Sequence, residues 1–333
     1  MRAMMCEKIG TDPVMRTVDD PVAAAGEVVI DVYACGVNFA DTLIIAGKYQ
    51  QKPEFPFVPG FEIAGVVSAT GAGVDAALNG QRVMAMAPHG GFAEKIALPA
   101  DRIIPIPDGV SFDDAAAFQI TYGTSWFALK YRASLQGGEV VLVHGAAGGV
   151  GITAVECAKI LGARVIATAG GPEKCDIARQ HGADFVIDYK SADIVTSVRE
   201  ICQRQGWPAG VDVVYDPVGG DVFSQSLRCT VPGGRLLVIG FASGDIPQIP
   251  ANILLVKNIA VLGFYFGAYL DQNPEIARQG MGELLDNLAA GYITPSISQC
   301  FPLADVPRAF AALRDRTATS KMVIRCREPA SQG

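Results

Sequence analysis

The first part of the chain, residues 1–121, consists of short β-like runs separated by glycine and proline. Four of these runs occupy residues 27–34, 62–70, 81–87 and 93–99. Their length and spacing predict a compact, partly antiparallel β-domain.

After residue 121 the apolar runs are of the buried type and alternate with amphipathic stretches. The apolar runs occupy residues 139–146, 163–170, 184–189, 211–218, 234–241 and 258–266. Amphipathic stretches such as 149–161 and 173–181 lie between them. Buried strands that alternate with helices are typical of a doubly wound parallel sheet. We therefore predict an α/β protein with a Rossmann sheet and a second, mainly β, domain.

The last part of the chain loses this alternation. Its sequence pattern predicts helices over about 274–290 and 304–315, and strands at 296–301 and 321–326. Because these elements do not continue the βαβ pattern, we expect them to rejoin the first domain. The predicted organisation is a first domain of residues 1–121 and 267–333 and a nucleotide-binding domain of residues 122–266.

The segment VLVHGAAGGVGITAVECAKILGA carries the strongest local signal. A predicted strand and a predicted helix flank a loop in which Ala146, Gly148 and Gly151 fill the three positions of G-x-G-x-x-G. At the second position glycine lets the backbone approach a pyrophosphate, and at the third it lets the helix pack on the strand. With Gly149 and Val150 at the helix start, we predict a dinucleotide site; a purely structural turn is the alternative.

The residues after the second strand of this domain indicate which dinucleotide binds. No acidic residue stands where an NAD enzyme holds the ribose 2′-hydroxyl, and Gly170 leaves that place small and neutral. Lys174 and Tyr189 are near in the predicted fold and suit a 2′-phosphate, which favours NADPH. Against this, Lys174 could be a solvated helix residue, and Glu173 would repel a phosphate unless it points away.

Composition narrows the class of protein further. The net charge of −7 and the lack of a Lys/Arg run argue against nucleic acid or an anionic membrane as a partner. No apolar stretch reaches the roughly 20 residues that a membrane-spanning helix requires. The eight cysteines are scattered without a C-x-x-C pair, so we expect reduced, buried thiols and a cytoplasmic location.

Taken together, the motifs resemble the medium-chain dehydrogenase/reductase superfamily, and more narrowly its zinc-independent quinone oxidoreductase branch, which includes the ζ-crystallin-like proteins. The resemblance runs through VYACGVNFADTLIIAGKY, FPFVPGFEIAGVV, FQITYGTSWFAL, VHGAAGGVG, VVYDPVGGDVF, VIGFASG and ANILLVKNIAVLGFYFG. It implies a GroES-like catalytic domain beside the Rossmann domain. It also implies hydride transfer from NADPH to a quinone or a similarly activated carbonyl.

The resemblance also bears on metal binding. In the zinc-dependent alcohol dehydrogenases a cysteine ligand stands at the position of Asn38 and a histidine at the position of Phe61, while Glu62 is retained here. No Cys or His occurs near residues 119–121, where the third ligand should fall. Catalytic zinc needs three protein ligands, so we expect no metal.

Without a metal, hydrogen bonds must stabilise the negative charge that develops on the acceptor oxygen. By resemblance Asn38 is the first candidate donor, with Asp41 three residues on to orient the loop. Tyr49 is a candidate phenol or proton donor. The residues alone favour a turn-forming role for the Asn38 side chain, and they fit Tyr49 equally well as a loop aromatic.

Further cofactor contacts are implied by the resemblance or by position at the ends of the predicted strands, where open α/β sheets bind ligands. They are Thr121, Val218, Gly240, Phe241, Phe264, Phe266 and Lys321. The side chains of Phe264 and Phe266 could simply be core, so only backbone contact is expected from them. Lys321 could be a surface lysine.

The apolar run 258–266 reads as a strand at the edge of the nucleotide sheet, where an exposed edge would promote aggregation. In the superfamily this strand commonly pairs with its copy, so we predict a homodimer. Two alternatives to quinone reduction remain: an enoyl-thioester or enone reductase, and a non-catalytic NADPH-binding protein. A small-molecule acceptor is the expected partner in the enzymatic cases.

Overall fold

The computed structural model describes residues 1–315 and 317–327 of the chain. It divides into two compact units. Unit 1 is formed by Met1–Ile120 together with the segment that begins at Thr294, and unit 2 by Thr121–Ile293. The last six residues of the predicted first domain, 328–333, lie outside the described residues.

Unit 1 is built on a seven-stranded sheet in which neighbouring strands are mostly antiparallel. The strand order is β14-β15-β3-β4-β5-β7, and β6 pairs with β3. Only β14 and β15 pair in parallel. The strands are β3 (Glu27–Val37), β4 (Glu62–Thr70), β5 (Arg82–Met86), β6 (Lys95–Pro99), β7 (Ile103–Pro105), β14 (Ile297–Pro302) and β15 (Lys321–Arg325); a separate hairpin joins β1 (Arg2–Met5) and β2 (Val14–Thr17).

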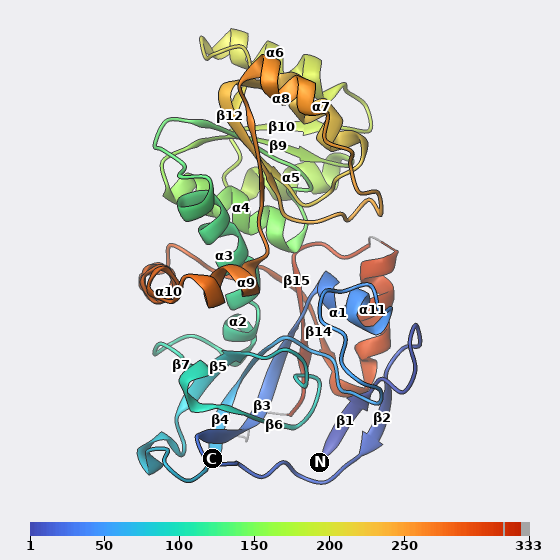
Figure 1. The fold of residues 1–333 in the computed structure, drawn as a ribbon, viewed down its shortest axis with the longest axis vertical. Helices are drawn as coiled ribbons and strands as arrows, with labels where there is room; N and C mark the ends of the chain where they lie inside the picture. Colours follow the sequence, from blue (N-terminus) through green and yellow to red (C-terminus); the bar gives the residue numbers. More distant parts are fainter. Residues whose placement is uncertain (316, 328–333) are drawn as a thin grey trace. The chain divides into compact units, whose positions relative to one another are not determined.

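The core of unit 1 forms where the buried faces of these strands meet three helices. These helices are α1 (Phe39–Ile45), α2 (Phe112–Ala116) and α11 (Val306–Arg314). The side chains of Ile30, Ile63 and Phe310 are fully buried there. Helix α11 contacts α1, although some 260 residues separate them in the sequence, as Figure 1 shows. The C-terminal elements are therefore an integral part of unit 1.

Unit 2 is a six-stranded, wholly parallel sheet with the strand order β10-β9-β8-β11-β12-β13. Counted along the chain this is 3-2-1-4-5-6, the order of the Rossmann fold. The strands are β8 (Val140–Val143), β9 (Arg164–Ala169), β10 (Phe185–Asp188), β11 (Val211–Asp216), β12 (Thr230–Val238) and β13 (Ala260–Gly263). This confirms the predicted α/β fold with a parallel sheet.

The helices of unit 2 are α3 (Gln119–Trp126), whose first two residues belong to unit 1 and which continues as a π-helix over Phe127–Arg132, α4 (Gly149–Ile160), α5 (Pro172–Gln180), α6 (Ile194–Gln205), α7 (Asp221–Cys229), α8 (Ala251–Lys257), α9 (Phe266–Gln272) and α10 (Pro274–Ala289). Helices α4 and α5 follow the first two strands of unit 2, as the amphipathic stretches 149–161 and 173–181 predicted. Local sequence determines both ends of α6. The Asp193 side chain caps its start by accepting a hydrogen bond from the Thr196 N–H, and Gly206 ends it in the left-handed conformation.

The end of the sheet differs from the predicted strand 258–266. Strand β13 spans only Ala260–Gly263, and Phe266 instead opens α9. The reason is tertiary packing: the Phe266 ring fills the space where a Cβ on Gly123 would lie, 2.3 Å from its Cζ, and contacts the ring of Phe127. The apolar sequence 258–266 alone does not show that the strand ends at Gly263 and that Phe266 reaches the core from the start of a helix.

The segment 267–293, which the sequence suggested would rejoin the first domain, packs within unit 2. Helix α10 is held there by Glu283, whose carboxylate accepts hydrogen bonds from Trp126 Nε1, Lys130 Nζ and Tyr131 Oη. Gly280 lies against the Phe127 ring, where a Cβ would come within 2.5 Å of Cζ.

No helix within residues 1–315 and 317–327 is long and apolar enough to cross a membrane.

Candidate active site

The loop between β8 and α4 forms a tight turn at the carboxyl end of the sheet. The Gly148 N–H donates to the Gly145 carbonyl at 2.9 Å, and the Ala146 N–H donates to the Thr168 carbonyl at 3.0 Å. A Cβ on Gly151 would lie 2.1 Å from the Gly145 carbonyl oxygen, so only glycine permits this approach of helix and turn. The third glycine of the motif thus permits a close approach between α4 and the turn, whereas the sequence led us to expect close packing on the strand.

At the start of α4, backbone N–H donors have no acceptor among the residues that the structure describes. Gly148 is its N-cap and provides no side-chain cap. The N–H groups of Gly149, Val150 and Gly151 belong to the first turn, where no helical carbonyl can accept from them. A Cβ on Gly148 would meet nothing closer than 3.4 Å, so the outer side of this glycine is open. Such an N-terminus suits the phosphate groups of a dinucleotide.

Strands β8 and β11 flank the point at which the sheet order reverses, where open α/β sheets bind ligands. A Cβ on Gly145 would lie 3.4 Å from Val218 Cγ2, so the loops after β8 and β11 touch there. Asp216 Oδ1 accepts from the N–H groups of Val218 and Gly219 and thereby holds the second loop. Gly240 and the partly exposed Phe241 follow β12 at the same edge of the sheet.

The end of β9 brings together the residues proposed for the 2′-phosphate. The Tyr189 hydroxyl lies 2.5 Å from where a Gly170 Cβ would be, and Lys174 lies in the first turn of α5. A second cation, Lys190, was missed: its Nζ is 4.0 Å from a Cβ built on Gly171. Its place directly after Tyr189 was the available signal.

Phe264, Phe266 and Thr121 lie inside unit 2. The Phe264 and Phe266 rings are buried, with centroids 6.4 Å apart. The Phe264 N–H donates to the Val238 carbonyl and so extends the pairing of β13. The Thr121 carbonyl accepts from Thr153 Oγ1 at 2.9 Å. The two phenylalanine side chains therefore serve the core, which leaves only their backbone for a ligand.

Unit 1 contains a buried polar cluster formed by Asn38, Asp41, Glu62 and Lys321. Lys321 Nζ donates to Asn38 Oδ1 at 2.6 Å and to Glu62 Oε1 at 2.5 Å. Asn38 Nδ2 donates to the same Glu62 oxygen at 3.0 Å and to the Gly36 carbonyl at 3.3 Å. Lys321, predicted as a cofactor contact, thus lies in unit 1 beside the predicted catalytic amide.

Asp41 shapes the loop that carries Asn38. Its Oδ2 accepts from the Asn38 N–H at 2.8 Å and its Oδ1 from the Gly60 N–H at 3.1 Å, which ties the start of α1 to the loop before β4. Tyr49 is half-buried, and its ring lies 5.4 Å from the Phe61 ring. Asp41 therefore has the loop-holding contacts expected of it, and Tyr49 packs as an aromatic.

Asp41 also gives unit 1 a pH dependence. Burial raises the pKa of Asp41 to about 7, although two backbone N–H donors and Lys321 oppose the shift. The pKa of Asp41 in the folded state exceeds the unfolded value near 3.9. The stability that protonated Asp41 contributes to the folded state is therefore complete below about pH 4 and is lost as the pH rises through 7. We expect wild type to lose up to about 4 kcal/mol relative to Asp41→Asn over that range, measured by urea unfolding. A difference that stays constant with pH would contradict the shift.

Two further residues of this region were not predicted as site residues. Glu62 is the centre of the cluster, since its Oε2 also accepts from the Ile120 N–H at 2.9 Å. Gln119, the residue before Ile120, is 1% exposed, and neither atom of its amide has a hydrogen-bond partner among the described residues. The signal for Glu62 was its position after Phe61; nothing in the sequence distinguished Gln119 from a solvated glutamine.

Comparison with known proteins follows the same two units. Residues 24–108 match the alcohol dehydrogenase GroES-like domain, and residues 149–285 match the family described as zinc-binding dehydrogenase. The quinone oxidoreductase-like protein 2 homolog of Nematostella vectensis is 41% identical over 334 residues, which cover 98% of this chain and 89% of the relative. The chain belongs to the quinone oxidoreductase branch of the medium-chain dehydrogenase/reductase superfamily.

Solved structures of this branch share the fold over the full length. The quinone oxidoreductase of Thermus thermophilus, solved alone and with NADPH, is 36% identical with a TM-score of 0.84, covering 98% of this chain and 100% of its own. Escherichia coli quinone oxidoreductase complexed with NADPH is 30% identical with a TM-score of 0.89 and the same coverage.

Asn38 and Phe61 occupy the positions at which the zinc-dependent alcohol dehydrogenases have metal ligands, and both residues have other contacts in this structure. Asn38 presents its oxygen to the Lys321 ammonium, and Phe61 is a buried apolar side chain. Within the described part of the chain, no three His, Cys, Asp or Glu side chains are grouped so that they could hold a metal ion.

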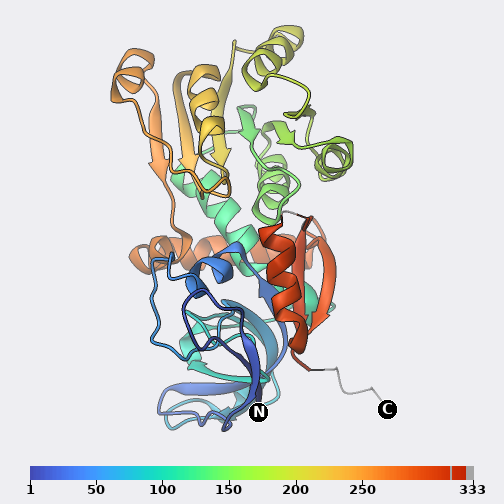
Figure 2. The ribbon, with the colours of Figure 1, turned by 90° about the vertical axis from the view of Figure 1, so that its right-hand side faces the viewer.

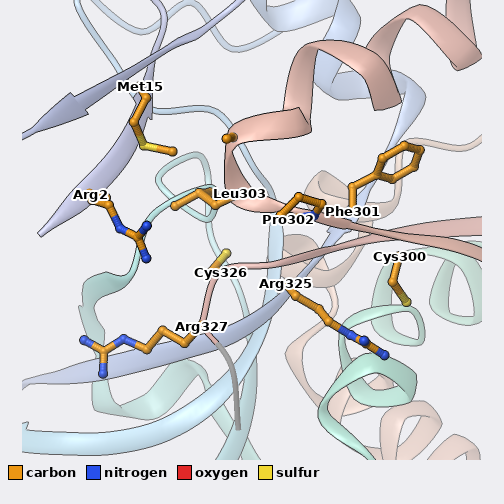
Figure 3. Close-up of a pocket in the computed structure, with 10 residues that line it drawn as sticks. Arg2, Met15, Cys300, Phe301, Pro302, Leu303, Arg325, Cys326 and Arg327 are labelled. Atoms are coloured by element: carbon orange, nitrogen blue, oxygen red, sulfur yellow. The ribbon is translucent and has the colours of Figure 1, made fainter.

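A surface pocket of about 560 Å³ lies elsewhere on unit 1 (Figure 3). It is lined by Arg2, Met15, Cys300, Phe301, Pro302, Leu303, Ala304, Arg325, Cys326 and Arg327. Each arginine is already paired with a carboxylate: Arg2 with Glu94, Arg325 with Asp113 and Arg327 with Asp31. The pocket therefore offers little uncompensated charge, and we assign it no role in the branch's chemistry.

Proposed function

We propose that this chain is an NADPH-dependent, zinc-independent oxidoreductase that reduces a quinone or a similarly activated carbonyl compound. The observation that carries the proposal is the glycine-tight turn before α4, which presents three uncapped N–H groups. The names of the relatives support the acceptor class, since one is a quinone oxidoreductase-like protein 2 homolog and the two solved structures are of quinone oxidoreductases. Unit 2 would serve as the nucleotide-binding domain and unit 1 as the catalytic domain.

The residues present fit NADPH. The first-turn N–H groups of Gly149, Val150 and Gly151 would hold its pyrophosphate. Lys174, Tyr189 and Lys190 would hold the 2′-phosphate, which needs cations and a phenol rather than an acid. The loops that contain Val218, Gly240 and Phe241 and the backbone near Thr121, Phe264 and Phe266 would bound the rest of the site. NADPH would supply the hydride.

The chemistry of the donor set supports the metal-free assignment. Zinc takes thiolate, imidazole or carboxylate ligands, whereas this chain has an amide at Asn38 and an aromatic ring at Phe61. The Asn38 oxygen is also already bound to the Lys321 ammonium. An acceptor that is electrophilic by itself, such as a quinone, needs only hydrogen-bond donors to stabilise its oxygen.

The test is an NADPH-oxidation screen of 1,4-quinones, enones and enoyl thioesters, with NADH in parallel. We expect turnover of a quinone, a preference for NADPH of at least about tenfold in kcat/KM, and no loss of rate after chelation. The preference follows from charged contacts to the 2′-phosphate. Zinc-dependent recovery after chelation would overturn the metal-free assignment, and turnover of thioesters alone would replace the acceptor class.

Lys190 gives a sharper test of the coenzyme preference. Lys190→Met removes one cation near Gly171 and should raise the KM for NADPH about tenfold, because a charge-assisted hydrogen bond is lost. Lys190→Arg keeps the charge and should stay close to wild type. The KM for NADH should be unchanged in both variants. An equal rise for both coenzymes in Lys190→Met would contradict a 2′-phosphate contact.

We also propose a homodimer that forms through β13. Among the described strands, β13 pairs with β12 alone and forms the outer edge of the sheet (orange in Figure 2). On α8, just before β13, Leu255 and Val256 are 79% and 78% exposed. Sedimentation should give twice the chain mass of 35.0 kDa, and Ala260→Lys, which places a charge at an exposed position of the edge strand, should give monomers. A monomeric wild type would contradict the proposal.

A cytoplasmic location is proposed on the state of the thiols. All eight cysteines are unpaired, and seven of them are buried. Thiols that remain reduced are typical of proteins in reducing compartments.

A further inference from the structure

Lys321 has hydrogen-bonding capacity that the protein does not use. An ammonium carries three N–H donors. Two of those on Lys321 are directed to Asn38 Oδ1 and Glu62 Oε1, and the third has no acceptor among the residues that the structure describes. The residue is only 5% exposed, so water cannot freely take the place of that acceptor.

Gln119 also has unused hydrogen-bonding capacity, and it is the sequence neighbour of the residue that binds the other oxygen of this carboxylate. The backbone N–H of Ile120 donates to Glu62 Oε2, which fixes the start of α3 beside Glu62. Gln119 is the residue before Ile120. The oxygen and the nitrogen of its side-chain amide both lack hydrogen-bond partners among the residues that the structure describes. A buried amide without hydrogen-bond partners is rare in folded proteins, so we expect this one to bind a ligand.

We propose that Lys321 and Gln119 bind the carbonyl oxygen of the acceptor. Glu62 is the positioning residue: it holds Lys321 directly and Gln119 through the backbone N–H of Ile120. The inference rests on the proposed function and names the residues that recognise its acceptor. Lys321 donates its third N–H, and Gln119 donates from its amide, to the oxygen that gains negative charge. Asn38 then acts on the acceptor only through Lys321, since both hydrogens of its amide are already donated within the protein.

The charges of the cluster select the class of ligand. Glu62 offsets the charge of Lys321, so the pair as a whole is close to neutral. A permanently charged carboxylate or phosphate would gain little there after losing its hydration. A neutral carbonyl costs less to bury and acquires charge only during the reaction, when fixed donors in a dry site stabilise it most. The cluster therefore fits a quinone or enone oxygen better than the phosphates of a cofactor.

The test compares Gln119→Leu and the double variant Lys321→Met/Glu62→Gln with wild type. Gln119→Leu removes an unpartnered amide, and the double variant removes both members of the ion pair, so neither leaves a buried charge uncompensated. We expect kcat/KM for a 1,4-quinone to fall at least about tenfold in the first and about 100-fold in the second. The Kd for NADPH, from fluorescence titration, should stay within twofold, and calorimetry should show weaker binding of a 1,4-hydroquinone to the protein without coenzyme.

The matched control is Gln299→Leu, an exposed glutamine on β14, which should leave all three quantities unchanged. If the wild-type protein turns over the quinone and both test variants keep its kcat/KM, this inference is overturned while the proposed function stands. A tenfold higher Kd for NADPH with unchanged kcat in the double variant would overturn it too, since Lys321 would then serve the coenzyme. Absence of turnover in wild type would contradict the proposed function itself.

Discussion

Replacing Lys321 with methionine is expected to lower the free energy of unfolding by about 3–5 kcal/mol, because it leaves the carboxylate of Glu62 buried without its counter-ion. Glu62 is 0% exposed, and Lys321 is the only cation that forms an ion pair with it among the described residues. The loss would be measured as a shift in the midpoint of chemical unfolding at constant m-value.

A double-mutant cycle separates this loss from ordinary packing effects. Glu62→Gln in the Lys321→Met background removes the stranded charge and should recover most of the lost stability. Arg314→Met is a suitable control, since its ion pair with Asp12 is exposed to solvent and should contribute less than about 1 kcal/mol. Equal destabilisation by the single and double variants would show that the ion pair does not account for the effect.

Gly151→Ala is expected to reduce kcat/KM with NADPH by about 100-fold and to destabilise unit 2 by about 1–3 kcal/mol. The new Cβ would lie 2.1 Å from the Gly145 carbonyl oxygen and 2.8 Å from Ala146 Cα. These are backbone atoms that cannot rotate away, so α4 must move and carry its first-turn N–H groups with it. Thermal unfolding and steady-state kinetics measure the two effects.

Gly148→Ala provides the matched comparison within the same loop. Its Cβ would meet only the Gly145 oxygen at 3.4 Å, and its φ of −90° suits alanine, so the fold should be unaffected. Binding of NADPH should still weaken, because the methyl group points to the open side where the pyrophosphate would lie. Should Gly148→Ala bind NADPH as wild type does, the dinucleotide would not use this loop as proposed.

Much of the fold could be predicted because each strand carries its own local signal. The run 62–70 coincides with β4, and the runs that begin at residues 139, 163 and 184 contain β8, β9 and β10. The phosphate loop could be predicted for the same reason: strand, glycines and helix follow one another within 20 residues or so. In both cases the residues that determine the structure are neighbours in the chain.

The rest of the candidate site depends on contacts between distant residues, which no local pattern encodes. Lys321 meets Glu62 across 259 positions, so the sequence could indicate neither residue's partner. Asn38 could be recognised as an amide at a former ligand position, but not as one whose hydrogens are already donated to Glu62 and Gly36. The role expected of Asn38 therefore passes, in our proposal, to Lys321.

The position of β15 has a consequence for how the protein forms during translation. β15 lies between β14 and β3, inside the sheet, although it is made last, whereas residues 121–293 form a continuous unit. A nascent chain can therefore close unit 2 while the end of β3, Ala34–Val37, still lacks its partner strand β15 and Glu62 lacks its counter-ion. Ribosome-bound chains halted before residue 321 should accordingly recruit holdase chaperones, and a premature stop there should be degraded rather than accumulate as a partly active enzyme.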